Sequence, residues 1–266
     1  MLIDQYLDAI LLGLVEGLTE FLPVSSTGHL ILLDELLGFN GPPGKVFEVV
    51  IQLGAILAIC VVYFARLWNV AIGLKDDPGA RRFVIAVLLA FLPAMVLGAG
   101  LHGIIKSVLF NPTVVSLALI VGGVAILVVE RFVPAPRYHR IEGFPAPLAL
   151  KIGLCQCLAL VPGVSRSGAS ILGALLMGVD RRAAAEFSFF LAVPTMAGAT
   201  AYDLYKNWRG MSFDDGALIA VGFITAFIAA ALVVKMLVDF VGRYGFTPFG
   251  WYRIAIGTGM LAFLYL

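Results

Sequence analysis

The chain has 266 residues, of which 61% are hydrophobic and only 13% are charged, and its mean hydropathy is +1.01. This charged fraction is about half that of an ordinary soluble domain, and a globular core of this size has no room for so much apolar sequence, so a water-soluble monomer is excluded. The net charge of +1 gives no basic surface for nucleic acid, which leaves lipids and small polar solutes as the expected partners.

Six apolar stretches are long enough to cross about 30 Å of hydrocarbon, which takes about 20 helical residues. They comprise residues 46–65, 83–105, 112–130, 184–203, 215–238 and 247–266. Four other apolar segments are too short to span, and they form two pairs that proline or glycine interrupts: 2–22 with 24–37, and 147–161 with 165–178. The sequence therefore predicts an all-α integral membrane protein with about six transmembrane helices and two broken helix pairs. Its 29 glycines, among them Gly98 and Gly100, favour close helix packing.

Two carboxylates precede the first break. Glu16 and Glu20 are spaced i, i+4, so a helix places both on one face about 6 Å apart. Two like charges on an apolar helix require a cation between them or a shared proton. One interpretation is a divalent metal held by Glu16 and Glu20, and the alternative is a hydrated helix end at the membrane interface.

Polar residues follow Pro23 at the first break. A serine after a broken helix is a typical N-cap, and the next backbone amides form an anion site at the helix N-terminus. In the functional interpretation Ser26 is a nucleophile, Ser25 and Thr27 bind phosphate, and His29 activates the serine or protonates a leaving oxygen. The alternative is plain capping by the serines and a structural, hydrogen-bonded His29.

The second break carries an arginine. Arg166 lies in PGVSRSG, and a guanidinium at membrane depth needs a fixed anionic partner, for which its planar fork suits phosphate oxygens. Ser165 and Ser167 add hydrogen-bond donors for binding. The alternative for Arg166 is an ion pair with Glu16 or Glu20, which a substrate would displace.

The two interrupted segments repeat each other. They read GLVEGLTEFLPVSSTGHLIL, from Gly13 to Leu32, and GLCQCLALVPGVSRSGASIL, from Gly153 to Leu172. A shift of 140 residues aligns Glu16 with Gln156, Ser25 with Ser165 and Ser26 with Arg166, and a shift of 138 aligns helices expected to begin at Glu48 and Glu186.

Each half then holds one broken pair and three spans. If the broken pair enters and leaves on the same face, the odd number of crossings inverts the second half relative to the first. We expect a single membrane domain over 1–266, with inverted repeat 1 at about 1–132, inverted repeat 2 at about 146–266 and a connecting loop at about 131–145. Matching breaks in inverted halves predict a site near the bilayer midplane.

Basic residues in the loops predict the orientation. Ten fall on one side and four on the other: Arg66, Lys75, Arg81, Arg82, Arg131, Arg137, Arg140, Arg181, Arg182 and Arg243 against Lys45, Lys106, Lys206 and Arg209. The side with ten is expected to be cytoplasmic, with both termini and the mouth of the first break outside. The N-terminal segment lacks a basic region and a small-residue cleavage site, so we expect it to remain in the mature protein.

Two motifs carry a family resemblance. EGLTEFLPVSSTGH, from Glu16 to His29, and PGVSRSG, from Pro162 to Gly168, closely resemble the bacterial undecaprenyl-diphosphatase family associated with bacitracin resistance, and EFSFFLAVP extends the match. The resemblance covers essentially the whole chain. It implies a multi-pass hydrolase of the bacterial cytoplasmic (inner) membrane that converts undecaprenyl diphosphate to undecaprenyl phosphate and inorganic phosphate. This reaction recycles the lipid carrier for peptidoglycan synthesis and confers bacitracin resistance.

The resemblance also implies a site and its partners. Carried onto this chain, Glu16 and Glu20 form the glutamate motif for a divalent cation, Mg²⁺ or Ca²⁺. Ser26, His29, Glu20 and Arg166 are the expected catalytic residues, and Arg166 also binds phosphate. The substrate is a polyprenyl diphosphate lipid, the two repeats contain re-entrant helices, and the active site opens to the periplasmic or outer face. A homodimer is compatible with this resemblance.

A different class of protein shares the predicted architecture. Inverted repeats with broken helices are also typical of secondary transporters, so a lipid-phosphate or anion carrier is the alternative function, which fold analogy does not decide. A cluster of a hydroxyl, a histidine, two carboxylates and an arginine is more than anion binding needs. The composition of the expected site therefore favours the enzyme.

Overall fold

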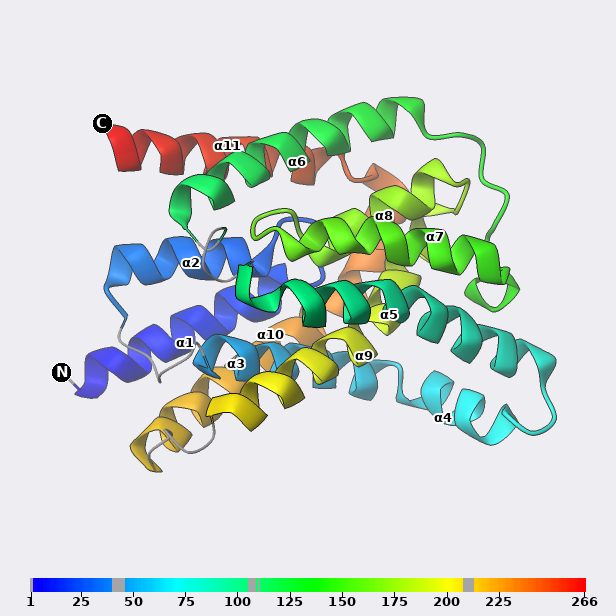
Figure 1. Ribbon diagram of the computed structural model, residues 1–266, viewed down its shortest axis with the longest axis horizontal. Helices are drawn as coiled ribbons and strands as arrows, with labels where there is room; N and C mark the ends of the chain where they lie inside the picture. The colour runs from blue at the N-terminus through cyan, green and yellow to red at the C-terminus, as the bar shows by residue number, and fades with distance from the viewer. Residues whose placement is uncertain (1, 40–45, 105–108, 110, 208–212) are drawn as a thin grey trace.

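The computed structural model describes residues 2–39, 46–104, 109, 111–207 and 213–266, and all regular elements in these ranges are helical (Figure 1). The α-helices are α1 (Leu2–Thr19), α2 (Ser26–Leu37), α3 (Val46–Val62), α4 (Phe64–Gly73), α5 (Pro78–Ile104), α6 (Pro112–Phe132), α7 (Ala146–Gln156), α8 (Arg166–Leu176), α9 (Arg181–Asn207), α10 (Phe213–Tyr244) and α11 (Thr247–Tyr265). Two short 3-10 helices, η3 (Ile141–Gly143) and η4 (Cys157–Leu160), flank α7. The prediction of an all-α protein is confirmed.

Three helices in the described ranges are long and apolar enough to cross a membrane. They are Pro78–Gly100, Pro112–Phe132 and Gly216–Tyr244, with mean hydropathies of 2.5, 2.5 and 2.7. Between 28% and 39% of their most apolar segments is buried inside the protein, so most of each helix faces outward, as a lipid-facing helix does. The chain is therefore a multi-pass membrane protein.

The other expected spans differ from the prediction. Helices α3 and α4 qualify as one span only when taken together, because the chain bends by 71° between them. Helices α9 and α11 have 27 and 19 residues but are not among the apolar spans, since α9 contains Pro194 with several polar residues and α11 contains Arg253. The described residues thus provide three spans, or four with the bent pair, and the expected six are not confirmed.

Both broken helix pairs lie where the sequence predicts them. Helix α1 ends at Thr19 before α2 begins at Ser26, and η4 ends at Leu160 before α8 begins at Arg166. Ser25 and Ser165 have φ angles of 68° and 78°, the only positive values at non-glycine positions among the described residues. Their hydroxyls accept hydrogen bonds from the backbone N–H groups of Gly28 and Gly168, at 3.2 and 3.0 Å. The two breaks therefore share one local geometry, in which a strained serine caps the following helix.

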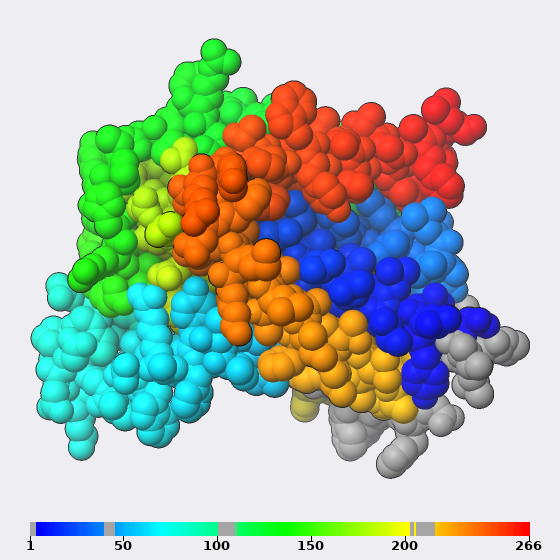
Figure 2. Space-filling model, turned by 180° about the vertical axis from the view of Figure 1, so that it is seen from behind, coloured from blue at the N-terminus to red at the C-terminus, as the bar shows by residue number. Residues whose placement is uncertain are grey.

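Close backbone approaches hold the first helices against α10. A Cβ atom at Gly17 of α1 would lie 2.3 Å from the carbonyl oxygen of Ala226, and one at Gly54 of α3 would lie 2.4 Å from that of Phe223. Figure 2 shows α10 crossing the back of the molecule alongside α1. Glycine packing is thus confirmed here.

The same expectation is wrong for the two glycines of α5. Among the described residues, the nearest neighbour of a Cβ added at Gly98 is the Leu160 side chain at 3.6 Å, and a Cβ added at Gly100 meets nothing within 4 Å. No backbone in the part of the chain that the structure describes approaches either glycine closely, so glycine content alone did not indicate which helix faces touch.

The termini lie together at one end of the molecule, and the connection between α6 and α7 lies at the other end with α4 (Figure 1). At this second end Arg66 of α4 pairs with Glu142 of η3 and, at 2.9 Å, with Glu186 of α9. Burial opposes the charge of Glu142, but the hydrogen bond from Arg66 outweighs it and holds the pKa of Glu142 below its ordinary value.

The expectation that Glu186 begins a span is wrong, because α9 begins at Arg181. Of the basic residues counted for the opposite end, Lys45, Lys106 and Arg209 lie outside the described residues, and Lys206 lies in the last turn of α9.

Candidate active site

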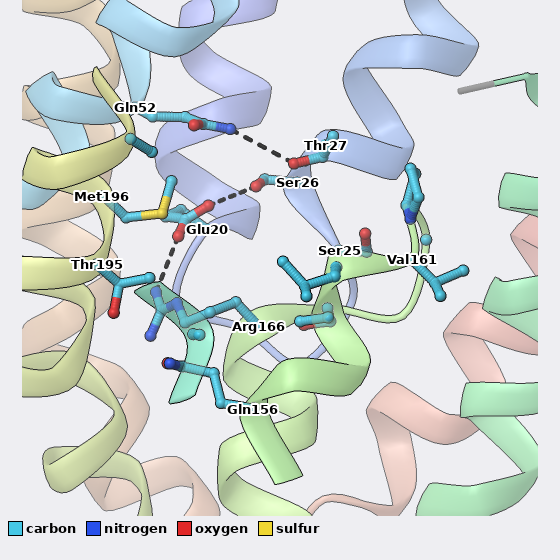
Figure 3. Close-up of a pocket in the computed structure, with 17 residues that line it drawn as sticks. Glu20, Ser25, Ser26, Thr27, Gln52, Gln156, Val161, Arg166, Thr195 and Met196 are labelled. Carbon is cyan, nitrogen blue, oxygen red and sulfur yellow. Dashed lines mark hydrogen bonds and ion pairs between the residues drawn. The ribbon is translucent and has the colours of Figure 1, made fainter. Parts of the chain in front are cut away.

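A cavity of about 240 Å³ lies where the two breaks meet (Figure 3). The first break contributes Glu20, Ser25, Ser26 and Thr27, and the second contributes Gln156, Ser165 and Arg166. Helices α3 and α9 complete the wall with Gln52, Thr195 and Met196. Residues about 140 positions apart in sequence therefore contribute polar side chains to one cavity.

The Glu20 carboxylate joins the two halves of the cavity. Its Oε2 accepts a hydrogen bond from Ser26 Oγ at 2.5 Å, and its Oε1 pairs with Arg166 Nη2 at 2.8 Å (Figure 3). The Arg166 and Glu20 side chains are only 10% and 5% exposed, so this ion pair is shielded from solvent. A hydroxyl that donates to a carboxylate is the arrangement of a nucleophile and its base. The ion pair expected as one interpretation of Arg166 is thus present.

Arg166 is fixed from its other side by α9. Its Nη1 donates to the backbone oxygen of Ser188 at 2.7 Å and to the hydroxyl of Ser188 at 3.1 Å, while Nε has no partner among the described residues. Ser170 donates a hydrogen bond to the same Ser188 hydroxyl at 2.8 Å. The guanidinium is therefore positioned before any ligand arrives.

His29 is not among the residues that line the cavity. Its Nδ1 lies 2.8 Å from the backbone oxygen of Ser25, and its Nε2 lies 2.8 Å from the hydroxyl of Tyr252 in α11, whose ring stacks on the imidazole. Both ring nitrogens are therefore occupied by other partners than Ser26. The geometry therefore favours a structural role for His29, which links α2 to α11, over a direct role in proton transfer.

Some of the remaining serine and threonine residues line the cavity, and others have a structural role outside it. Ser25, Thr27 and Ser165 line the cavity, and Thr27 accepts a hydrogen bond from Gln52 at 3.4 Å. Ser167 is buried outside the lining, where its hydroxyl donates to the backbone oxygen of Leu22 at 2.8 Å. Ser167 thus ties the second break to the first, and the structure does not bring it to the cavity as an anion donor.

The carboxylates provide a chemically suitable place for a divalent cation. Glu16 is fully buried, neither of its carboxylate oxygens has a hydrogen-bond partner among the described residues, and the Glu20 N–H bonds to its backbone oxygen at 2.9 Å, one helical turn away. A buried carboxylate without a donor needs a cation or a proton. No group of three or more acidic, histidine or cysteine side chains forms a metal cage in the described ranges. Two carboxylates with the remaining ligands from water and phosphate suit Mg²⁺ or Ca²⁺, so the residues fit this cofactor.

Arg253 is a residue of the site that the sequence analysis missed. It is 1% exposed, and its guanidinium donates hydrogen bonds to five backbone carbonyls, with no acidic partner among the described residues. The acceptors are Pro23 at 3.0 Å, Gly163 at 2.8 Å and Val164 at 2.9 Å in the two breaks, and Ala118 at 3.0 Å and Leu119 at 3.3 Å in α6. A single arginine within an apolar segment was the available signal.

These features define an all-helical membrane protein with a cavity, where two broken helix pairs meet, that holds a serine, a carboxylate and an arginine. The family model described as "Bacitracin resistance protein BacA" matches residues 9–259, and the chain belongs to this family. It is 60% identical over 254 residues to "Undecaprenyl-diphosphatase 2" of Paramagnetospirillum magneticum, covering 96% of this chain and 97% of that protein. It is also 60% identical over 262 residues to "Undecaprenyl-diphosphatase" of Parvibaculum lavamentivorans, covering 98% of each chain. An Azospirillum brasilense protein with the same name is 86% identical over 187 residues, which are 70% of this chain and all of that protein.

The role of Arg253 generates a stability prediction. Arg253→Met keeps the length of the side chain but removes its donors, which leaves buried carbonyls unpaired at about 1–3 kcal/mol each. We expect the midpoint of thermal unfolding in detergent to fall by about 10 °C or more. Arg253→Lys keeps the positive charge but has fewer donors, so we expect its midpoint to lie between those of the wild-type chain and Arg253→Met. The exposed Arg131→Met is the matched control, with a shift within about 2 °C. A shift that small for Arg253→Met would contradict the account.

Proposed function

We propose that this protein is an integral membrane phosphatase that hydrolyses undecaprenyl diphosphate to undecaprenyl phosphate and inorganic phosphate. The observation that supports this assignment most directly is the Glu20 carboxylate, which accepts a hydrogen bond from the Ser26 hydroxyl and pairs with Arg166 in one cavity. The activity named for the relatives that match nearly the whole chain supports the same assignment. In the cell this reaction recycles the lipid carrier for peptidoglycan synthesis and confers bacitracin resistance.

The geometry suggests how the chain performs this hydrolysis. The terminal phosphoryl group enters beside Arg166, whose guanidinium stabilises the charge that spreads over the transferred phosphoryl oxygens. Phosphate oxygens replace Glu20 as the partner of Arg166, and the freed carboxylate accepts the proton of the nucleophile. The nucleophile is Ser26 Oγ, or a water that Ser26 holds, and it attacks the terminal phosphorus. Attack by Ser26 forms a phosphoserine, which a water then hydrolyses to release inorganic phosphate and restore the hydroxyl, whereas attack by water releases inorganic phosphate directly.

The leaving group needs little help from the protein. The bond between the terminal phosphorus and the bridging oxygen breaks, and that oxygen departs on a lipid monophosphate, which carries negative charge readily near neutral pH. A general acid is therefore not essential, which agrees with the placement of His29 against Ser25 and Tyr252.

We further propose that Glu16 and Glu20 hold a divalent cation, Mg²⁺ or Ca²⁺, next to the phosphoryl group. The unpartnered oxygens of Glu16 support this assignment. When bound, the cation supplies neutralisation of the charge on the diphosphate.

The proposed membrane arrangement is two inverted repeats with re-entrant pairs and about six spans, in the bacterial cytoplasmic membrane, with the active site open to the outer face. The matched geometry of Ser25 and Ser165 supports the repeats. The excess of basic residues in the loops at the end opposite the termini supports the orientation. The isoprenoid tail then lies among the spans while its head group reaches the cavity.

The activity is tested in detergent, where no gradient exists to drive a carrier. We expect the purified chain to release inorganic phosphate from undecaprenyl diphosphate, and Ser26→Ala to lose about 100-fold or more in kcat/KM because the hydroxyl at the reacting centre is gone. Ser116→Ala is the matched control, since Ser116 is a buried serine that bonds to Pro112 in α6 and does not line the cavity. Binding of the lipid without phosphate release would favour the carrier instead.

The cation site is tested by titration. Glu16→Gln preserves shape but removes a charge, so we expect weaker binding of Mg²⁺ alone in calorimetry and a shift of the activating Mg²⁺ concentration by about 10-fold or more. Glu35→Gln, which changes an exposed glutamate of α2, serves as the control and leaves both measurements unchanged. Identical titrations for Glu16→Gln and the wild-type chain would remove Glu16 from the site.

A further inference from the structure

Gln156 is the last residue of α7, and its side chain lines the cavity near Arg166 (Figure 3). The residue is 2% exposed, and neither Nε2 nor Oε1 has a hydrogen-bond partner among the described residues. A buried amide without partners is costly and is rare in folded proteins. Such a group is explained when a ligand in the cavity completes its hydrogen bonds.

A second donor in the same cavity is also unpaired. The Nε–H of Arg166 is buried without a partner, although Nη1 and Nη2 of the same guanidinium bond to Ser188 and Glu20. Two unpartnered N–H groups therefore belong to residues that line one cavity, Gln156 at the end of α7 and Arg166 at the start of α8. A phosphoryl group has several oxygens that accept hydrogen bonds, so a single ligand of this class is able to satisfy both donors.

The amide differs from the other polar groups in its position. In the sequence repeat Gln156 corresponds to Glu16, so the second half carries a neutral donor where the first half carries a carboxylate. Gln52, the other glutamine in the lining, already donates to Thr27. Glu20 is the only acidic side chain in the described lining, and an acid at position 156 would add a second negative charge facing an anionic ligand.

We propose that Gln156 is a substrate-binding residue whose Nε2 donates a hydrogen bond to a non-bridging oxygen of the phosphoryl group held by Arg166. The assignment rests on the proposed function, since it places the reacting phosphate beside Arg166. It makes Gln156 a determinant of phosphate affinity in the second break, where Ser167 is instead part of the framework.

Two substitutions separate binding from a purely structural role. Gln156→Leu is similar in size and removes an unpaired buried amide, so we expect thermal stability to stay equal or rise while KM increases about 10-fold or more and kcat changes less. Gln156→Glu keeps the shape and adds a negative charge, and we expect a loss of about 100-fold in kcat/KM. A structural role would lower thermal stability together with activity in Gln156→Leu.

The decisive measurement is the affinity of the full purified chain for inorganic phosphate by calorimetry, alongside KM and kcat for undecaprenyl diphosphate. Phosphate binding about 10-fold weaker in Gln156→Leu supports the inference, and binding within about twofold of the wild-type value overturns it. Cys157→Ser, at the neighbouring position outside the lining, is the matched control with wild-type affinity. If the wild-type chain binds phosphate but releases none from the lipid, the proposed function fails and the Gln156 comparison still stands. If the wild-type chain binds no phosphate, the inference is overturned as well.

Discussion

The arrangement of this protein depends on one buried carboxylate that serves two partners. Glu20, directly after the end of α1, accepts one hydrogen bond from the hydroxyl of Ser26 in its own break and another from the guanidinium of Arg166, 146 residues later in the second break. A charge at this depth is stable only when it is paired, so each break needs the other. The same pairing leaves the site poised for an anion, because phosphate oxygens are alternative partners for Arg166.

A second constraint comes from the backbone of the breaks. Where a helix stops inside a membrane, its carbonyl groups have no water to accept hydrogen bonds from, and protein donors must replace it. Arg253 meets this requirement for both breaks and for α6 at once, which fixes the relative position of the two loops that carry Ser26 and Arg166. Glycine contacts such as that of Gly17 with α10 bring the surrounding helices close enough for this network to be enclosed.

The sequence predicted the features that depend on local chemistry. Proline and glycine indicated both breaks correctly, and Ser25 and Ser165, which the repeat aligns, share one capping geometry in the structure. Features that depend on packing were not predictable in this way: the direction in which His29 points is set by Tyr252, 223 residues away, and the packing faces of Gly98 and Gly100 are set by which helices surround α5. Counting apolar residues likewise placed 247–266 among the spans without weighing Arg253.

The central claim is that Ser26 and Arg166 act on one phosphoryl group, and a double-substitution cycle in kcat/KM tests it most directly. Residues that act as a unit lose their effects together, so the account predicts that Ser26→Ala combined with Arg166→Ala is no more than about threefold worse than the more damaging single change. All variants are compared as folded, monodisperse preparations hydrolysing undecaprenyl diphosphate. If the loss of kcat/KM in the double variant equals the product of the two single losses, the two residues act independently, and the account is contradicted.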